Sequence, residues 1–160
     1  MARVEQFVAD ISTYNNLMLD TNTIIYFLDG VSDFADLLAP LFEMIELGQI
    51  KANVSVISEA ELLVKPYRDN IQDALEVIKF FLDEFPNLKV ISVSREIADQ
   101  AAKIRADLGI KLPDAIILAT ALQNQCDLLL GNDLSLMRIA TKYLPTVLLN
   151  DYINTEQESR

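Results

Sequence analysis

Histidine is absent from this chain of 160 residues. Its absence excludes Ser-His-Asp and Cys-His catalysis, zinc sites built from histidine, and acid–base chemistry by imidazole. The single cysteine, Cys126, cannot form an intramolecular disulfide and favours a reducing compartment. Any catalysis must therefore depend on carboxylates, hydroxyls, lysine or a bound metal ion.

Long apolar runs are also missing. No uninterrupted apolar stretch approaches the roughly 20 residues that a membrane helix needs. Residues 1–14 carry two early acids and no long apolar core, unlike a signal peptide. We therefore expect a cytoplasmic protein with no membrane partner.

Glycine and proline are scarce, at 4 and 5 residues, while hydrophobic residues make up 51% of the chain. This composition excludes a disordered chain and is sufficient for one well-packed domain. We expect that domain to span residues 1–153, with 1–15 as an N-terminal helical extension and 154–160 as a polar tail.

Short apolar runs alternate with amphipathic segments along the chain. The apolar runs predict strands at 17–20, 51–57, 88–93, 127–131 and 146–150. Helical spacing predicts helices at 2–13, 21–29, 32–48, 58–64, 70–85, 94–108, 113–125 and 134–143. Continuous apolar strands separated by helices indicate a parallel sheet that is covered on both faces. The predicted fold is therefore an α/β three-layer sandwich, with a central parallel sheet flanked by helices.

Four carboxylates lie close to the ends of predicted strands or at the start of an apolar helix. They are Asp20, Glu61, Asp114 and Asp133. Ligands of open parallel sheets bind beyond the carboxyl ends of the strands, so we expect these side chains to converge. Each also has an ordinary explanation: Asp20 as a helix cap, Glu61 in a capping box with Ser58, Asp114 in a first helical turn, and Asp133 in a turn. Capping explains each carboxylate separately but not their common location.

Carboxylates that share a site repel one another and cannot all stay ionised without compensation. A hard divalent cation provides that compensation, and oxygen ligands without sulfur or imidazole select Mg²⁺ or Mn²⁺. Such a site suits phosphodiester hydrolysis, because the metal lowers the pKa of a bound water and stabilises charge on the phosphate oxygens.

The segments around the four carboxylates resemble the PIN-domain nucleases. In chain order they are LMLDTNTIIYFL, SVISEAELL, LPDAIILATAL and LLLGND, and the resemblance covers residues 16–153 with similar spacing. It implies a Mg²⁺- or Mn²⁺-dependent endoribonuclease that cleaves single-stranded RNA by attack of a metal-activated water, leaving a 3′-hydroxyl and a 5′-phosphate. The resemblance also implies that the protein is the toxin of a toxin–antitoxin pair.

The resemblance assigns roles to individual residues. Asp20 and Asp114 would be the principal metal ligands, and Glu61 and Asp133 would complete the cluster, directly or through waters. Four polar neighbours would order the first loop or hydrogen-bond the carboxylates: Thr21, Asn22, Ser58 and Asn132.

Three bases near these carboxylates in the sequence have two interpretations. Lys65, Arg68 and Lys111 are either solvated surface residues or contacts to RNA phosphates flanking the metal. The net charge of -11 argues against a broad phosphate-binding face, so RNA binding would depend on local bases and the metal.

The chain departs from the family pattern at two places. Gly131 stands where many relatives have threonine, and Ser135 and Leu136 stand where an acid and an aromatic residue are frequent. A missing hydroxyl and a missing fifth acid would weaken metal binding or alter its geometry. The alternative function is therefore a catalytically weak or inactive PIN-fold module that binds protein or RNA.

Two protein partners also follow from the resemblance. One is a small antitoxin-like inhibitor that inserts a basic residue into the acidic cluster. The other is a second copy of the chain, bound through the apolar helices at 2–13 or 32–48. A phospho-acceptor receiver domain also uses an acidic pocket with Mg²⁺, but its paired acids near the first strand and its lysine after the last are not evident.

Other residues that could carry chemistry are better explained by packing. Cys126 is expected to be a small buried residue. The aromatic residues at helical spacing are expected in the core: Tyr26, Phe27, Phe80, Phe81 and Phe85. The chain has no glycine-rich phosphate loop, which argues against an ATPase or a dinucleotide enzyme.

Overall fold

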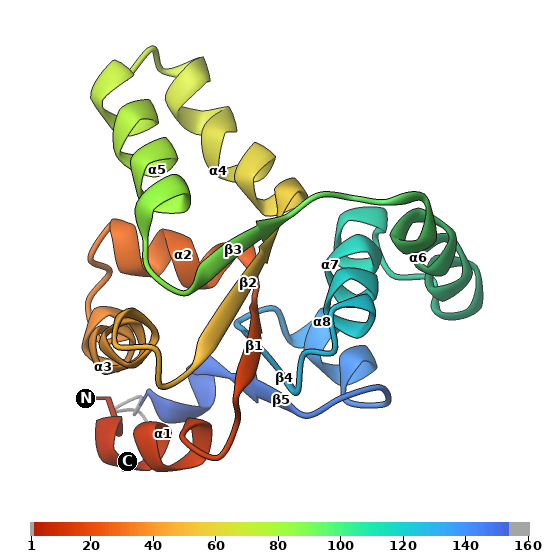
Figure 1. Ribbon diagram of the computed structural model, residues 1–160, viewed down its shortest axis with the longest axis horizontal. Coiled ribbons are helices and arrows are strands. Elements are labelled where there is room, and N and C mark those ends of the chain that lie inside the picture. The colour runs from red at the N-terminus through yellow and green to blue at the C-terminus, as the bar shows by residue number, and fades with distance from the viewer. Residues whose placement is uncertain (1, 154–160) are drawn as a thin grey trace, which may run out of the picture.

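The computed structural model describes residues 2–153 and contains one parallel sheet. Its strands are β1 (Asn16–Leu19), β2 (Lys51–Ser55), β3 (Leu88–Ile91), β4 (Leu128–Gly131) and β5 (Thr146–Leu148). The strand order is β3-β2-β1-β4-β5, and all neighbouring strands pair in parallel (Figure 1). The polar tail predicted at 154–160 lies outside the described residues.

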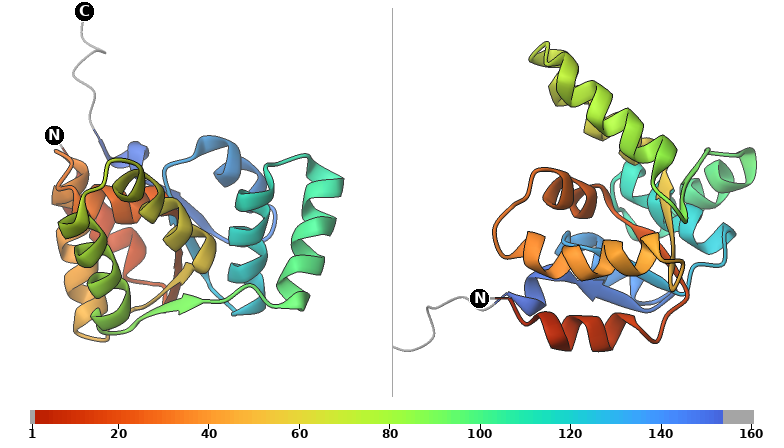
Figure 2. Two further views of the ribbon diagram at one scale, coloured as in Figure 1. Left: turned by 90° about the horizontal axis from the view of Figure 1, so that it is seen from above. Right: turned by 60° about the vertical axis from the view of Figure 1, so that its left-hand side comes forward.

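Helices cover both faces of the sheet, which confirms the predicted three-layer α/β class. They are α1 (Val4–Ile11), α2 (Thr21–Leu28), α3 (Phe34–Glu46), α4 (Val56–Arg68), α5 (Gln72–Glu84), α6 (Arg95–Leu108), α7 (Leu112–Gln123), α8 (Leu134–Ala140) and a short 3-10 helix, η1 (Leu149–Tyr152). Helices α1–α3 lie on one side of the sheet and α6–α8 on the other (Figure 1). Helices α4 and α5 form a hairpin that projects away from the body of the molecule (Figure 2). Within residues 2–153, every helix is too short or too polar to span a membrane.

The central strands supply side chains to two separate cores. Leu17 and Leu19 of β1 pack into the core beneath α1–α3, whereas Met18 between them packs into the core beneath α6–α8. Strand β4 divides in the same way: Leu129 joins Met18, and its neighbours on either side join the other core. Successive side chains of a strand point to opposite faces, so continuous apolar runs fill both layers.

The chain changes direction across the sheet at β1 and β4. From β1 it moves outward to β2 and β3, and it then returns to form β4 and β5 on the other side of β1. In open α/β sheets, ligands bind beyond the carboxyl ends of the strands at such a switch point. Asp20 directly follows β1, and its backbone N–H donates to Leu130 O of β4 at 3.0 Å.

Helix α4 begins earlier than predicted. It starts at Val56 rather than Ser58, because Ser55 caps it by accepting a hydrogen bond from Ile57 N at 3.2 Å. The predicted capping box of Ser58 and Glu61 is therefore wrong, and both residues lie inside the helix. The helix also continues past Val64 through Pro66.

Proline removes one backbone donor from a helix, yet Pro66 lies inside α4, beyond the predicted helix end at residue 64. Its side chain is buried, and its carbonyl accepts a hydrogen bond from Ile71 N at 3.0 Å where the hairpin turns into α5. This packing accounts for the longer helix.

One of the aromatic residues predicted in the core is on the surface. Phe80 on α5 is 70% exposed, whereas the adjacent Phe81 is 8% exposed and packs near Phe42. Phe27 stacks on Phe42 with ring centroids 3.9 Å apart. Because the α4–α5 hairpin projects from the body, one face of α5 has no neighbour within the described residues.

The predicted N-terminal helix is present as α1 and is packed into the fold. Phe7 and Ile11 are fully buried, and the Phe7 ring lies edge-on to Tyr152, with centroids 5.2 Å apart. Ala2 forms an antiparallel bridge with Ile153, so the two ends of the described chain lie together.

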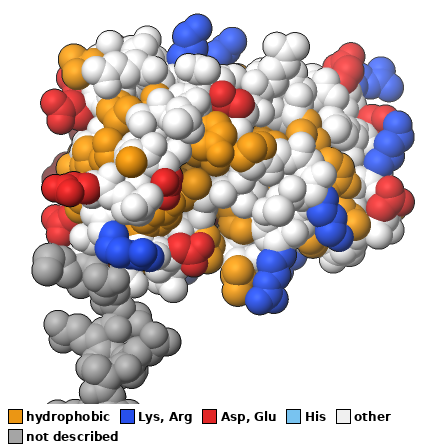
Figure 3. All heavy atoms as spheres, turned by 90° about the horizontal axis from the view of Figure 1, so that it is seen from below, with side chains coloured by type: hydrophobic (Ala, Val, Ile, Leu, Met, Phe, Trp, Pro, Cys, Tyr) orange, Lys and Arg blue, Asp and Glu red, His pale blue; other side chains and the backbone are white. Residues whose placement is uncertain are grey.

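Seen from below Figure 1, the molecule shows hydrophobic side chains across the middle of the surface and charged side chains mostly at its edges (Figure 3).

Candidate active site

Asp20 lies at the end of β1, where the chain turns into α2. Its Oδ1 accepts hydrogen bonds from Thr23 N and Thr23 Oγ1, both at 2.9 Å, and its Oδ2 accepts one from Asn132 N at 3.1 Å. Only 3% of the residue is exposed. Burial raises the pKa of Asp20, and the hydrogen bonds from Thr23 and Asn132 partly oppose that increase. Asp20 therefore caps α2 while lying at the switch point of the sheet.

Glu61 is positioned by a contact between α4 and α2. Thr21 Oγ1, in the first turn of α2, donates to Glu61 Oε1 at 3.1 Å. The same oxygen lies 2.8 Å from Ser58 Oγ, and Ser58 is fully buried one turn before Glu61. This hydroxyl pair links the loop after β1 to the exposed Glu61 carboxylate.

Asp114 and Asp133 come from the other side of the sheet. Asp133 caps α8 by accepting a hydrogen bond from Leu136 N at 3.2 Å. Asp114 lies in the first turn of α7, directly after Pro113. Burial is the largest cause of a rise in the pKa of Asp114 from 3.8 to about 6, followed by the negative charges of Asp133 and Glu61.

The structure brings the four carboxylates to one cavity. This cavity of about 230 Å³ is lined by Asp20, Thr21, Asn22, Ile25, Glu61, Asp114, Ile117, Asp133 and Leu136. The residues come from α2, α4, α7 and α8 and from the loops after β1 and β4, and three of them are apolar: Ile25, Ile117 and Leu136.

The four carboxylates do not form a preformed metal-binding site. Within residues 2–153, no three acidic, histidine or cysteine side chains are grouped closely enough to hold an ion. The oxygens of Asp20 are instead engaged by Thr23 and Asn132. The donor set still fits a hard divalent cation, because it consists of oxygens, and because uncompensated negative charge raises the pKa of Asp114.

The polar neighbours contribute in ways that differ partly from the prediction. Asn132 reaches Asp20 through its backbone N–H; its side chain instead binds Tyr26 Oη at 3.1 Å and Asn150 N at 2.8 Å. Asn22 lines the cavity. Thr23 was missed, although the third residue after an N-cap is an expected partner of the capping side chain.

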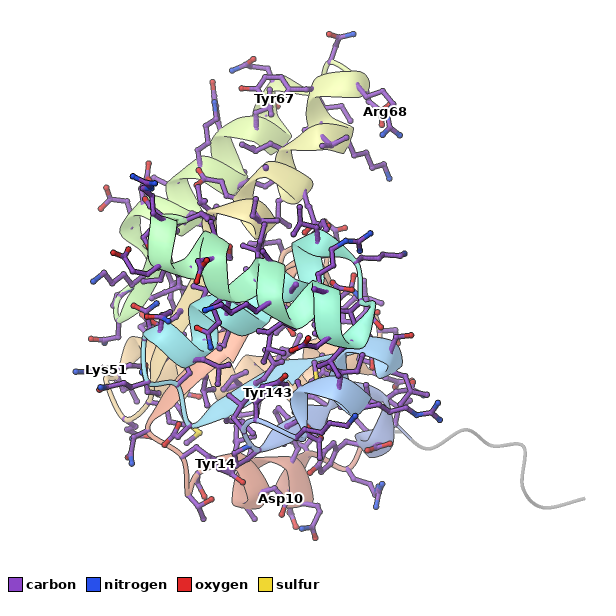
Figure 4. The ribbon with its side chains drawn as sticks, turned by 90° about the vertical axis from the view of Figure 1, so that its right-hand side faces the viewer. Asp10, Tyr14, Lys51, Tyr67, Arg68 and Tyr143 are labelled. Atoms are coloured by element: carbon purple, nitrogen blue, oxygen red, sulfur yellow. The ribbon has the colours of Figure 1, made fainter. Side chains whose placement is uncertain are left out.

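The three predicted bases lie at different places. Lys111 precedes Asp114 by one turn, and its charge lowers the pKa of Asp114, although the acidic neighbours outweigh this effect. Lys65 is exposed one turn after Glu61. Arg68 lies beside Tyr67 at the far end of the α4–α5 hairpin (Figure 4).

Comparisons with known proteins give a family and a set of similar folds. Residues 17–142 match the model of the PIN domain family, whereas no curated protein matches the chain. A toxin-antitoxin complex from Klebsiella pneumoniae is similar, with 24% identity over 73% of this chain and 86% of that one, at a TM-score of 0.56.

Two further structures align over most of their length. VapBC2 from Rickettsia felis, bound to a DNA fragment from its promoter, has 21% identity over 83% of this chain and 98% of that one, at a TM-score of 0.63. DNA-bound VapBC from Salmonella typhimurium has 21% identity over 84% and 98%, at a TM-score of 0.62. At these identities the structures demonstrate a shared fold. The family match covers most of the chain and all four carboxylates, and the chain therefore belongs to the PIN domain family.

Proposed function

We propose that this PIN-domain protein is a divalent-metal-dependent endoribonuclease of the toxin type that cleaves single-stranded RNA. The observation that carries the proposal is the cavity at the switch point of the sheet, on which Asp20, Glu61, Asp114 and Asp133 converge from different elements. These residues would hold Mg²⁺ or Mn²⁺. When bound, such an ion lowers the pKa of a water molecule and stabilises negative charge on the phosphate.

The residues around the cavity have complementary roles in this proposal. Thr21 keeps Glu61 beside the loop after β1, and the hydrogen bonds of Thr23 and Asn132 fix the direction of the Asp20 carboxylate. Lys111 lies close to Asp114 and provides positive charge for an RNA phosphate at the edge of the cavity. Arg68 lies in the last turn of α4, at the far end of the α4–α5 hairpin, and does not line the cavity (Figure 4).

Cleavage of single-stranded RNA in Mg²⁺ and in Mn²⁺ tests the proposal. We expect the wild type to cleave and both Asp20→Asn and Asp114→Asn to lose cleavage. Asp107→Asn, on the exposed surface of α6, is the matched control and should cleave like the wild type. Equal cleavage by Asp114→Asn and the wild type would contradict the proposal. A wild type that neither cleaves RNA nor is stabilised by Mn²⁺ would support the alternative, an inactive binding module.

We also infer a small inhibitor protein as partner, because the similar solved structures include toxin–antitoxin complexes. A groove of about 750 Å³ beside α5 supports this inference. It is lined by apolar residues, Leu28, Val77, Phe80, Phe81, Phe85 and Pro86, and by acids, Glu46, Asp73, Glu76 and Glu84. An amphipathic helix with an apolar face and basic edges fits such a groove.

Co-expression with the product of a small neighbouring reading frame tests the partner. We expect the two proteins to purify together and Phe80→Ala to abolish the association, because Phe80 is a large exposed aromatic in the groove. Tyr143→Ala, another exposed aromatic residue that lies outside the groove, is the control. Unchanged association of Phe80→Ala would place the partner elsewhere.

A further inference from the structure

Gly131, the last residue of β4, lies directly against the carboxylate of Asp20. A Cβ atom at position 131 would lie 2.2 Å from Asp20 Oδ2 and 2.5 Å from Asp20 Cγ. It would also lie 2.5 Å from Met137 Cε. Non-bonded carbon atoms pack at about 3.5–4.0 Å, so these distances are incompatible with a side chain. In this chain the Asp20 carboxylate and the Met137 methyl group occupy the space that any other side chain at 131 would fill. A threonine at this position, as in many relatives, therefore requires a different placement of these two side chains, and the expectation that its absence weakens metal binding is reversed here.

The backbone does not require glycine at this position. The glycines with positive φ are Gly30, Gly48 and Gly109, whereas Gly131 has an ordinary strand conformation and pairs with Leu148. Glycine within a strand often marks a close approach of another group, and here that group is Asp20. Glycine at position 131 is therefore explained by the lack of room for a side chain and not by the backbone conformation.

This space also determines which Asp20 oxygen remains available. A carboxylate can accept about four hydrogen bonds, two on each oxygen. Oδ1 already accepts two, from Thr23 N and Thr23 Oγ1, and Oδ2 accepts one, from Asn132 N. The remaining acceptor position is on Oδ2, the atom that a side chain at 131 would strike first.

We propose that Gly131 is a positioning residue, whose missing side chain allows the Asp20 carboxylate to lie against β4 and offer Oδ2 to a divalent cation. The proposal rests on the proposed function of the acidic cavity. A side chain at 131 would displace Oδ2, break the bond from Asn132 N and turn Asp20 away from its capping geometry. Even one methyl group should therefore weaken cation binding.

Mn²⁺ binding measured by titration calorimetry tests this role directly. Gly131→Ala should bind Mn²⁺ at least about tenfold more weakly than the wild type, the loss expected when the support of a metal ligand is disturbed. The control is the double variant Gly131→Ala/Met137→Ala, which removes the contact with Met137 but keeps the one with Asp20. Binding as weak as in Gly131→Ala would support the proposal, and recovery of wild-type affinity would overturn it.

Urea unfolding in EDTA provides a second measurement that needs no metal. Gly131→Ala should lower the unfolding midpoint of the wild type, but lower it by less than half as much in an Asp20→Ala background, where the obstructing carboxylate is gone. Equal decreases in the two backgrounds would overturn the proposal.

The two experiments also separate the proposal from the proposed function. A wild type that binds no Mn²⁺ would overturn the metal-dependent function and the cation role of Gly131 with it. Wild-type binding that Gly131→Ala retains in full would overturn the role of Gly131 alone.

Discussion

Replacing Asp114 by asparagine should stabilise the metal-free protein. The folded state holds Asp114 partly buried and close to Asp133 and Glu61, and these surroundings raise its pKa from 3.8 to about 6. At pH 7 the carboxylate is ionised in both states, but only the folded state suffers the desolvation and the repulsion. Within residues 2–153 no hydrogen bond contributes to the pKa of Asp114, so an amide of the same shape removes the charge without breaking a contact.

The size of the effect follows from the pKa. A rise from 3.8 to about 6 corresponds to at most about 3 kcal/mol between the two protonation states. Asp114 is only half-buried, and solvent screening reduces this to about 1 kcal/mol. For a chain of this length, that difference raises the melting temperature by about 2–4 °C.

The pH dependence has a definite sign. Well below pH 3.8 the carboxyl is protonated in the folded and the unfolded state, so Asp114 contributes no penalty. As the pH rises from 3.8 to about 6, the unfolded state loses its proton first and the wild type loses stability; above about 6 both states are ionised and the penalty stays constant. The melting temperatures of Asp114→Asn and the wild type should therefore differ little at pH 4 and separate fully by pH 7.

Thermal unfolding followed by circular dichroism, at pH 4 and pH 7 in EDTA, measures this difference. Excess Mn²⁺ at pH 7 should reverse the order, because a ligand at 100 times its Kd stabilises the wild type by about 2.7 kcal/mol and should not bind the variant. A variant no more stable than the wild type in EDTA at pH 7 would refute the account of Asp114 as a carboxylate with uncompensated charge.

Other substitutions give simpler expectations. Phe7→Ala should destabilise the fold by about 3–5 kcal/mol in urea, because Phe7 is fully buried, whereas Phe80→Ala should change stability by less than about 0.5 kcal/mol. Thr21→Val should weaken Mn²⁺ binding by about tenfold in calorimetry by releasing Glu61, and unchanged affinity would contradict the role of this hydroxyl. Lys111→Ala should weaken RNA binding in a filter assay and reduce its salt dependence, whereas Arg68→Ala should bind like the wild type.

Much of the fold was predictable because its signals are local. The strands are continuous apolar runs since Leu17, Met18 and Leu19 face two different cores, and this pattern alone indicates a doubly covered parallel sheet. The end of α6 could also be predicted from the sequence, because Gly109 adopts the left-handed conformation that terminates helices. Neither feature depends on a distant part of the chain.

The errors arose where a distant neighbour decides the outcome. Both Ser55 and Ser58 can cap α4, and the choice is made by the sheet, in which Ser55 still pairs with Ile91 of β3. Helical spacing placed Phe80 on an apolar face, but spacing does not reveal whether another element covers that face. The contact of Gly131 with Asp20 joins residues far apart in the chain, and no local pattern signals it.

The two principal carboxylates of the site differ in how their burial is compensated. Asp20 is more deeply buried than Asp114, but three hydrogen bonds stabilise its carboxylate. Asparagine at position 20 would turn an N–H₂ group towards one of those donors and leave it without an acceptor, so that variant perturbs the fold as well as the site. Asp114 has no such bonds within the described residues. Its carboxylate therefore lacks enough positive charge nearby to offset its burial and its acidic neighbours. Substitution of Asp114 therefore separates a loss of cation binding from a loss of structure more cleanly than substitution of Asp20.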